Sequence, residues 1–142
     1  MKGNPVVNTY LFFGGNCEEA LDYYAATLGA EIGAKMLFNE SPDPIPEGVL
    51  ASGFENKVMH AELKIGNVAI YASDGVSGES TFGGFSICVN YDDQAEAERV
   101  FKALATGGTI GMPWGPTFFS PLFGSVTDKF GLDWMISFGM EG

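Results

Sequence analysis

The sequence predicts an α+β fold made of two βαβββ modules, and two observations support this prediction. The order of strand and helix patterns in the first half of the chain returns in the second half. Two short stretches also repeat at matching places, residues 29–33 with 107–111 and residues 64–66 with 129–131. A single βαβββ module leaves one sheet face uncovered. We therefore expect curled mixed sheets with helices on their outer faces, and modules that pack together or pair across a dimer.

Module one begins with a predicted strand at residues 6–13, which Gly14 and Gly15 end. Asn16 followed by Glu19 has the spacing of a capping box and predicts a helix at residues 17–28. Gly29 stands where a C-cap glycine belongs. The predicted helix has one apolar face, made by Ala20, Leu21, Tyr24, Ala25 and Leu28.

The rest of module one is predicted to be strands at residues 31–38, 57–65 and 68–73. A polar loop with three prolines, residues 39–53, separates the first two of these strands. A loop of this length is either a functional lid or simply mobile. We place module one at about residues 1–74 and a Gly- and Ser-rich linker at about residues 75–84.

Module two, about residues 85–142, repeats this order, and the whole chain is predicted to be a single domain. Asp93 with Glu96 forms a second predicted capping box, and a helix follows at residues 94–106. The strands are predicted at residues 85–91, 109–114, 118–127 and 132–138, with a tight turn at residues 128–131. Asp74, Asp128 and Asp133 are interpreted as turn residues.

Charge and composition exclude several kinds of partner. The chain has 142 residues and a formal net charge of −11, so its surface repels a phosphate backbone, and nucleic acid is not an expected partner. No polybasic patch is present for a membrane surface, and no apolar run is long enough to cross a bilayer or to act as a signal peptide. We therefore expect a cytoplasmic location.

The two cysteines, Cys17 and Cys88, are predicted to be free thiols in a reducing compartment. Cys17 at a helix N-terminus is either a plain helix-start residue or a thiol with a lowered pKa.

The stretch Gly-x-Val-x-Asp-x-x-Gly-x-x-Trp at residues 124–134 resembles the end of a vicinal-oxygen-chelate (glyoxalase/bleomycin-resistance/dioxygenase) domain, in its PhnB-like branch. Residues 12–24, with the pair Tyr23-Tyr24, and the strand Met-His-Ala-Glu-Leu at 59–63 are similar to the same branch, so the resemblance covers nearly the whole chain. Residues 119–121, Phe-Ser-Pro, depart from the family pattern. The resemblance implies the two-module fold, a concave small-molecule site and pairing between chains.

The resemblance also implies where a metal would bind. In metal-dependent members the ligands come from the first and fourth strands of each module, and alignment of the two repeats places these positions at Thr9, Ile70, Ser86 and Met135. Neither these residues nor their immediate neighbours are His, Glu, Asp or Gln, the residue types that hold such an ion. We therefore predict no metal site, and we expect no cofactor.

His60, the single histidine, is a candidate acid or base. His60 and Glu62 alternate with apolar residues along the predicted strand 57–65, so they share one face. That face is either simply solvated or lines the cavity, where His60 and Glu62 would act as catalytic groups.

The remaining candidates would line a ligand pocket. The C-terminal part is rich in aromatic residues that belong either to the core or to an apolar cleft. The predicted pocket residues are Thr9, Tyr71, Trp114, Phe119 and Met135.

Three functions stay open at this point. The preferred prediction is a PhnB-like module that binds an unidentified small molecule without a metal, as a homodimer. The alternative is a metal-independent enzyme of the same superfamily that uses His60 as acid or base, and the third is an inert structural dimer. The sequence contains no phosphate-binding loop, no Ser-His-Asp spacing and no zinc cluster.

Overall fold

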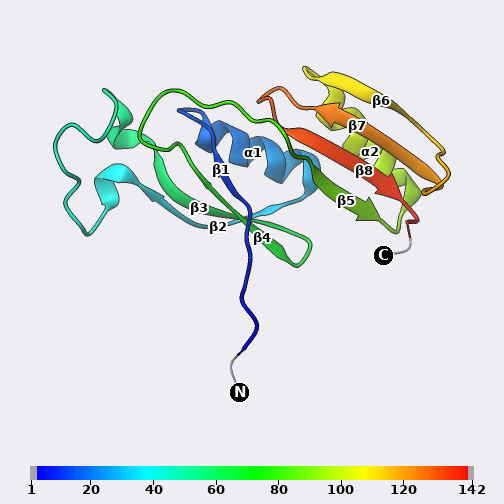
Figure 1. Ribbon diagram of the computed structural model, residues 1–142, viewed down its shortest axis with the longest axis horizontal. Coiled ribbons are helices and arrows are strands. Elements are labelled where there is room, and N and C mark those ends of the chain that lie inside the picture. The colour runs from blue at the N-terminus through cyan, green and yellow to red at the C-terminus, as the bar shows by residue number, and fades with distance from the viewer. Residues whose placement is uncertain (1–2, 141–142) are drawn as a thin grey trace. The chain divides into compact units, whose positions relative to one another are not determined.

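Each half of the chain contains one helix and one four-stranded mixed sheet, as the two-module prediction requires (Figure 1). The computed structural model describes residues 3–140. The chain divides into two compact units, Met1–Ser80 and Thr81–Gly142, and the boundary falls inside the predicted linker. We call them the N-terminal unit and the C-terminal unit. In each unit the helix covers one face of the sheet, and we call the other face the open face.

The N-terminal unit has the sheet order β1-β4-β3-β2, in which β1 and β4 are parallel and the other neighbours are antiparallel. Its elements are β1 (Tyr10–Phe12), α1 (Cys17–Leu28), β2 (Glu31–Leu37), β3 (Val58–Ile65) and β4 (Val68–Ser73). Two short 3₁₀ helices, Phe38–Glu40 and Phe54–Asn56, lie at the ends of the predicted long loop.

The C-terminal unit repeats this topology with the order β5-β8-β7-β6, where β5 and β8 are parallel. Its elements are β5 (Ile87–Tyr91), α2 (Gln94–Ala105), β6 (Thr109–Gly115), β7 (Leu122–Thr127) and β8 (Asp133–Phe138). The hairpins β3–β4 and β7–β8 occupy matching places, as the repeated residues 64–66 and 129–131 predict.

Several strands are shorter than predicted, β1 and β7 by the most. Residues 6–9 precede β1, because Val6 and Val7 are 85% and 86% exposed and bury no apolar surface. Residues 118–121 precede β7, because Thr117 Oγ1 accepts the backbone N–H of Ser120 at 3.0 Å and closes a turn there. Pro121, which has no N–H to donate to a ladder, follows this turn.

The core of each unit lies between its helix and its sheet. In the N-terminal unit it is formed by Cys17, Ala20, Leu21, Tyr24, Leu11, Ala61, Leu63, Ile70 and Ala72. In the C-terminal unit it is formed by Ala97, Val100, Phe101, Leu104, Val126, Trp134 and Ile136. Gly124 lets Phe101 lie directly on β7, since a Cβ at Gly124 would stand 2.6 Å from the Phe101 ring. Within residues 3–140, no helix is both long and apolar enough to cross a membrane.

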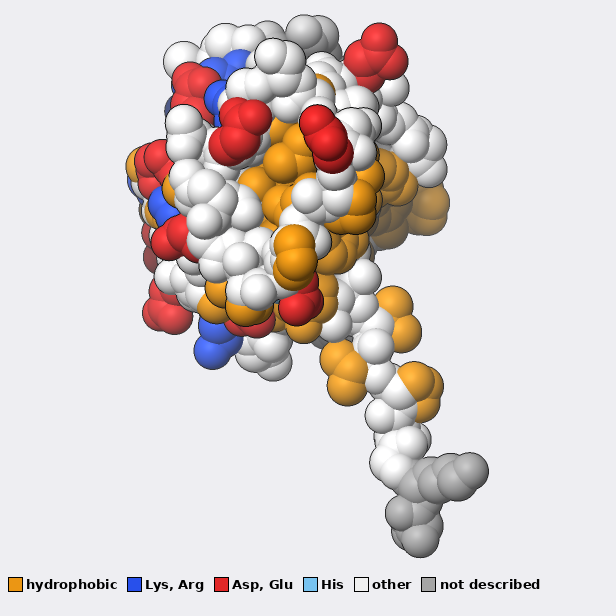
Figure 2. Space-filling view, turned by 90° about the vertical axis from the view of Figure 1, so that its left-hand side faces the viewer, with side chains coloured by type: hydrophobic (Ala, Val, Ile, Leu, Met, Phe, Trp, Pro, Cys, Tyr) orange, Lys and Arg blue, Asp and Glu red, His pale blue; other side chains and the backbone are white. Residues whose placement is uncertain are grey.

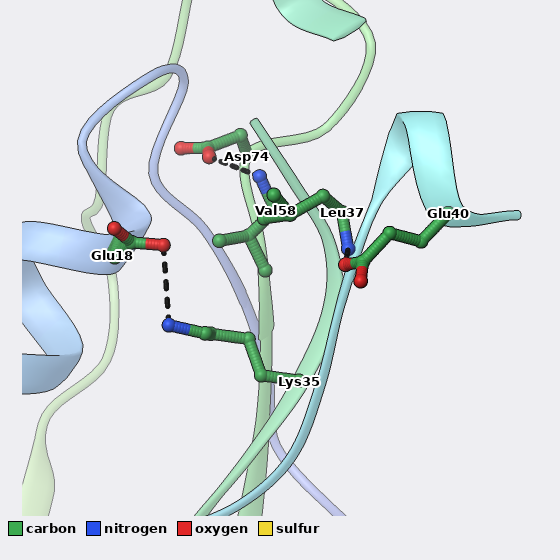
Figure 3. A network of polar contacts seen from close by, with 6 residues as sticks. All are labelled: Glu18, Lys35, Leu37, Glu40, Val58 and Asp74. Carbon is green, nitrogen blue, oxygen red and sulfur yellow. Dashed lines mark hydrogen bonds and ion pairs between the residues drawn. The ribbon is translucent and has the colours of Figure 1, made fainter. Parts of the chain in front are cut away.

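The capping box predicted at Asn16 is wrong. Asn16 makes no side-chain cap hydrogen bond; the start of α1 is instead held by Asp74, which directly follows β4. Asp74 Oδ1 accepts the backbone N–H groups of Gly15 at 2.7 Å and Cys17 at 2.8 Å, and Oδ2 accepts the N–H of Val58 at 2.9 Å. Figure 3 shows Asp74 reaching Val58 at the start of β3. Asp74 is 2% exposed and joins three segments, so it is more than a turn residue.

The cap predicted at Asp93 is confirmed, because its side chain accepts the backbone N–H of Ala95. The second half of that capping box is not formed: Glu96 lies 2.5 Å from Arg99 Nη2 in an ion pair along the surface of α2.

Asp128 is also more than a turn residue. Its Oδ1 accepts the N–H groups of Phe130 at 2.8 Å and Leu132 at 3.1 Å inside the β7–β8 hairpin. Its Oδ2 accepts the indole N–H of Trp134 at 2.8 Å, and Asp128 is 3% exposed. The stretch Val-x-Asp-x-x-Gly-x-x-Trp therefore forms one hairpin that is held together by hydrogen bonds to the buried Asp128 side chain.

Candidate functional site

An apolar cavity lies on the open face of the C-terminal unit and has a volume of about 410 Å³. Its lining is Cys88, Asn90, Met112, Phe119, Phe123, Ser125, Met135, Ser137 and Met140. Alternation along the strands sends these side chains away from α2, while Val126, Trp134 and Ile136 point towards it.

Four of the lining residues form one row across the sheet. Cys88 on β5 is in register with Met135 on β8, Met135 with Ser125 on β7, and Ser125 with Met112 on β6. Ser125 is small, so the row leaves a depression between the two methionines. The cavity floor therefore follows from strand register and from one short side chain.

Three polar side chains face this apolar lining. Ser137 donates its hydroxyl hydrogen to Asn90 Oδ1 at 3.0 Å, and the same oxygen accepts the backbone N–H of Met140 at 3.1 Å. Ser125 Oγ accepts the backbone N–H of Met112 at 2.8 Å. A hydroxyl that accepts one hydrogen bond still has its own hydrogen to donate, so Ser125 can orient a ligand.

Aromatic rings form one wall of the cavity. Phe119 packs edge-on against Phe123, with ring centroids 5.1 Å apart, and Phe118 packs edge-on against Phe119 from outside. Phe119 is 45% exposed and Phe118 is 101% exposed. Phe119 faces the cavity, and Phe118 does not line it.

A second cluster lies on the open face of the N-terminal unit. The hydroxyl of Tyr10 is 2.8 Å from His60 Nδ1, and the rings of His60 and Tyr71 are 5.2 Å apart. Phe12 stacks on Tyr10 with ring centroids 4.9 Å apart. Burial raises the pKa of Tyr10, which favours its neutral hydroxyl. Tyr10 is therefore suited to hold one nitrogen of the imidazole, although no motif in the sequence singles it out.

The predicted site residues fall into separate groups. His60 and Tyr71 meet in the N-terminal cluster, with Glu62 two residues along β3, on the same face as His60. Phe119 and Met135 meet in the C-terminal cavity. Thr9 is exposed, and its backbone carbonyl accepts the N–H of Tyr71 at 2.9 Å.

Trp114 does not join the C-terminal cavity. Its ring stacks on Phe101 of α2, with centroids 5.2 Å apart and an interplanar angle of 30°. It therefore packs with the helix and not on the open face.

The register of the implied metal positions needs correction. Ile70 is 4% exposed and packs in the core, whereas its neighbour Tyr71 is the residue in register with Tyr10 on the open face. In the C-terminal unit Met135 is in register with Cys88, and Ser86 lies before β5. Within residues 3–140, no three His, Cys, Asp or Glu side chains gather in a group that could hold a metal ion.

The proline-rich loop encloses a separate hollow of about 440 Å³. Phe38, Pro44, Ile45, Pro46 and Leu50 give it an apolar floor, and Asp43, Glu47 and Glu55 stand around it. Figure 2 shows the corresponding side of the molecule, where apolar side chains lie between Asp and Glu side chains. This hollow is formed by loop residues, and no element of the sheets holds its shape.

Cys17 is not an activated thiol. It is 0% exposed, and burial, followed by the nearby Asp74 carboxylate, raises its pKa far above the ordinary range. The lowered pKa considered for a thiol at a helix start does not occur, because the carboxylate that accepts the Cys17 N–H also opposes a thiolate there.

Comparisons with known proteins agree with this geometry. A family model described as 3-demethylubiquinone-9 3-methyltransferase matches residues 5–137. Protein YjdN from Escherichia coli (strain K12) is 38% identical over 137 residues, which are 92% of this chain and 93% of that protein.

Several solved structures share the fold of this chain. Protein PA1353 from Pseudomonas aeruginosa is 40% identical, with a TM-score of 0.82 over 97% of this chain and 100% of that chain. The PhnB protein from Bacillus cereus is 27% identical, with a TM-score of 0.79 over 95% and 100% of the two chains. A glyoxylase/bleomycin resistance protein/dioxygenase domain from Frankia sp. EAN1pec is 12% identical, with a TM-score of 0.66 over 97% and 99%, and shows the shared fold. The predicted resemblance and fold class are confirmed.

Proposed function

The chain belongs to the 3-demethylubiquinone-9 3-methyltransferase family of PhnB-like proteins, and we propose that it binds a small apolar molecule in the cavity of its C-terminal unit, without a divalent metal ion. The observation that carries this proposal is the cavity of about 410 Å³, whose lining is mainly Met, Phe and Cys. Sites for small molecules commonly have volumes of about 300–1,000 Å³ and a few polar groups that fix orientation.

The lining suits a ligand of variable shape. Methionine side chains are flexible and polarisable, and they adapt to different apolar surfaces. Met112, Met135 and Met140 line the cavity beside Phe119 and Phe123. The ligand class we propose is therefore an apolar or aromatic body with one acceptor for the Ser125 hydroxyl.

A neutral fluorescent probe tests this proposal. We expect N-phenyl-1-naphthylamine to bind with increased fluorescence, and M135K to weaken its binding at least tenfold, because a lysine would place a charge in the apolar cavity. V68K is the matched control, since Val68 is 55% exposed on β4 of the N-terminal unit. Equal probe binding by wild type and M135K would contradict the proposal.

The family description supplies a first compound for a ligand screen. It names 3-demethylubiquinone-9, and the quinone ring of this compound, without its long polyprenyl chain, belongs to the proposed ligand class. A compound that binds the native state raises the melting temperature by mass action, so a thermal-shift series should rank candidate ligands.

The Tyr10–His60 pair supports a second candidate function, a metal-independent enzyme that uses His60 as general acid or base. A tyrosine hydroxyl 2.8 Å from Nδ1 fixes the imidazole and leaves Nε2 to exchange a proton with a substrate. Any turnover found in a substrate screen should fall about 10²–10⁴-fold in H60A, the usual contribution of acid–base catalysis. If H60A only weakened ligand binding, His60 would be a binding residue.

A further inference from the structure

The cavity of the C-terminal unit is lined by several sulfur-containing side chains. The chain contains two cysteines and six methionines, and four of these eight side chains line this one cavity: Cys88, Met112, Met135 and Met140. Cys88 is a free, exposed thiol. Thiol and thioether sulfur also ligate soft metal ions, so the concentration of sulfur in one cavity points to a second chemical use.

Two of the four sulfur atoms are in direct contact, and a third sulfur-bearing residue lines the same cavity. Cys88 Sγ lies 3.7 Å from Met135 Sδ, because β5 and β8 pair in parallel with these two residues in register. Met140 lines the same cavity, and its backbone is held by Asn90, which lies two residues along β5 from Cys88. The Asn90 side chain donates to the Met140 carbonyl at 3.2 Å and accepts the Met140 N–H at 3.1 Å.

We propose that Cys88, Met135 and Met140 form a binding site for copper(I). Thiolate and thioether are soft ligands that select copper(I), whereas imidazole and carboxylate, which suit most divalent ions, are absent from the lining. Two sulfur atoms 3.7 Å apart can contact one ion between them. The short Ser125 side chain leaves room beside Met135, and the Phe119 and Phe123 rings line the same cavity.

The binding step is a ligand exchange, in which copper(I) leaves the chelator that carried it, such as bicinchoninate. The Cys88 thiol loses its proton to solvent, the thiolate sulfur forms a bond with copper, and the two thioethers donate lone pairs. Copper remains in the +1 state throughout, so no oxidant or reductant is consumed. This site lies in the same cavity as the proposed apolar ligand but does not depend on that ligand.

Anaerobic titration with copper(I) in competition with bicinchoninate tests the proposal. We expect one ion per chain, a copper X-ray absorption edge with only sulfur in the first shell, and at least tenfold weaker binding in both M135L and M140L. Leucine keeps the volume and removes the sulfur, so the fold is preserved. M59L is the matched control, because Met59 lies on β3 in the N-terminal unit, and its affinity for copper should equal that of wild type.

Two results would overturn the copper site. One is that the wild-type protein binds copper(I) no more tightly than C88S does. The other is that M135L and M140L bind copper(I) with the wild-type affinity, which would mean that the Cys88 thiol is the only sulfur ligand. Wild-type binding of N-phenyl-1-naphthylamine separates the two proposals. If the probe binds and copper does not, the copper site fails alone, and if copper binds and the probe does not, the apolar ligand proposal fails alone.

Discussion

Asp74 and Cys17 are joined across 57 residues of sequence: the Asp74 carboxylate accepts the backbone N–H of Cys17 at 2.8 Å and lies beside its buried thiol. The same carboxylate accepts the N–H groups of Gly15 and Val58. One buried acidic side chain thus starts α1, fixes the turn after β1 and starts β3.

We expect D74N to destabilise the N-terminal unit by about 2–4 kcal/mol. In D74N an amide NH2 group would replace one carboxylate oxygen. This group cannot accept a hydrogen bond, so at least one of the backbone N–H groups of Gly15, Cys17 and Val58 would lose its acceptor. Urea unfolding followed by circular dichroism measures the change. D22A, on the exposed surface of α1, is the control and should stay within about 0.5 kcal/mol of wild type. A D74N protein as stable as D22A would show that the three hydrogen bonds contribute little.

Stability should fall at alkaline pH because of Cys17. The pKa of the thiol is raised by folding, so the folded state keeps its proton while the unfolded chain loses it above the ordinary value of 9.0. The unfolded state then binds fewer protons, and the free energy of unfolding decreases as pH rises, by at most about 1.4 kcal/mol per pH unit. Urea unfolding between pH 9 and pH 10 should show this slope, and C17A should lack most of it. An identical slope in C17A would assign the effect to other groups.

The two thiols should differ sharply in reactivity. Cys88 is exposed and Cys17 is buried with a raised pKa, so Ellman's reagent at pH 8 should modify one thiol per native chain rapidly. C88A should remove the fast reaction, and both thiols of the wild type should react in urea. Rapid modification of C88A without denaturant would contradict the buried position of Cys17.

Gly124 should be intolerant of a side chain. In G124A the new methyl group would meet the Phe101 ring at 2.6 Å, and we expect a loss of about 1–3 kcal/mol in stability. G115A is the control on β6, because a Cβ at Gly115 meets nothing within 4 Å. Thermal unfolding of the two variants should separate them by several degrees, and equal melting temperatures would refute the close contact.

The homodimer remains a proposal. Each sheet has two edge strands, and unpaired strand edges invite pairing unless they are covered. The open faces also expose apolar side chains, among them Tyr10, Phe12, Met112 and Met135. Sedimentation at micromolar concentration should give twice the chain mass of 15.1 kDa. A mass of one chain would end this proposal.

The order of elements could be predicted from sequence because helix and strand periods are local signals. Helices predicted at residues 17–28 and 94–106 are observed at Cys17–Leu28 and Gln94–Ala105. Strand ends were less accurate where a local turn, as at Thr117, competes with the ladder. Asp74 accepts a hydrogen bond from Gly15, which is 59 residues away in the sequence. No local pattern connects two such distant residues, so this contact could not be predicted from the sequence.

The site was predicted less well because it depends on register. The shift of one residue that separates Ile70 from Tyr71 moves a side chain from the core to the open face. The position of Cys88 beside Met135 follows from the parallel pairing of β5 with β8, which joins strands 47 residues apart. The Tyr10–His60 contact spans 50 residues, and no motif in the sequence connects them.

The two helix caps have different consequences for the order of folding. α2 is capped by Asp93, two residues before Ala95, so its first turn can form as soon as its own segment is present. The start of α1 needs Asp74, which reaches it only after β4 has paired. Contacts at large sequence separation form late because loop closure costs entropy. The helix α1 should therefore form together with its sheet, whereas α2 can form before its sheet does. Because the contacts of Asp74 form late in folding, substitutions at Asp74 should mainly accelerate unfolding.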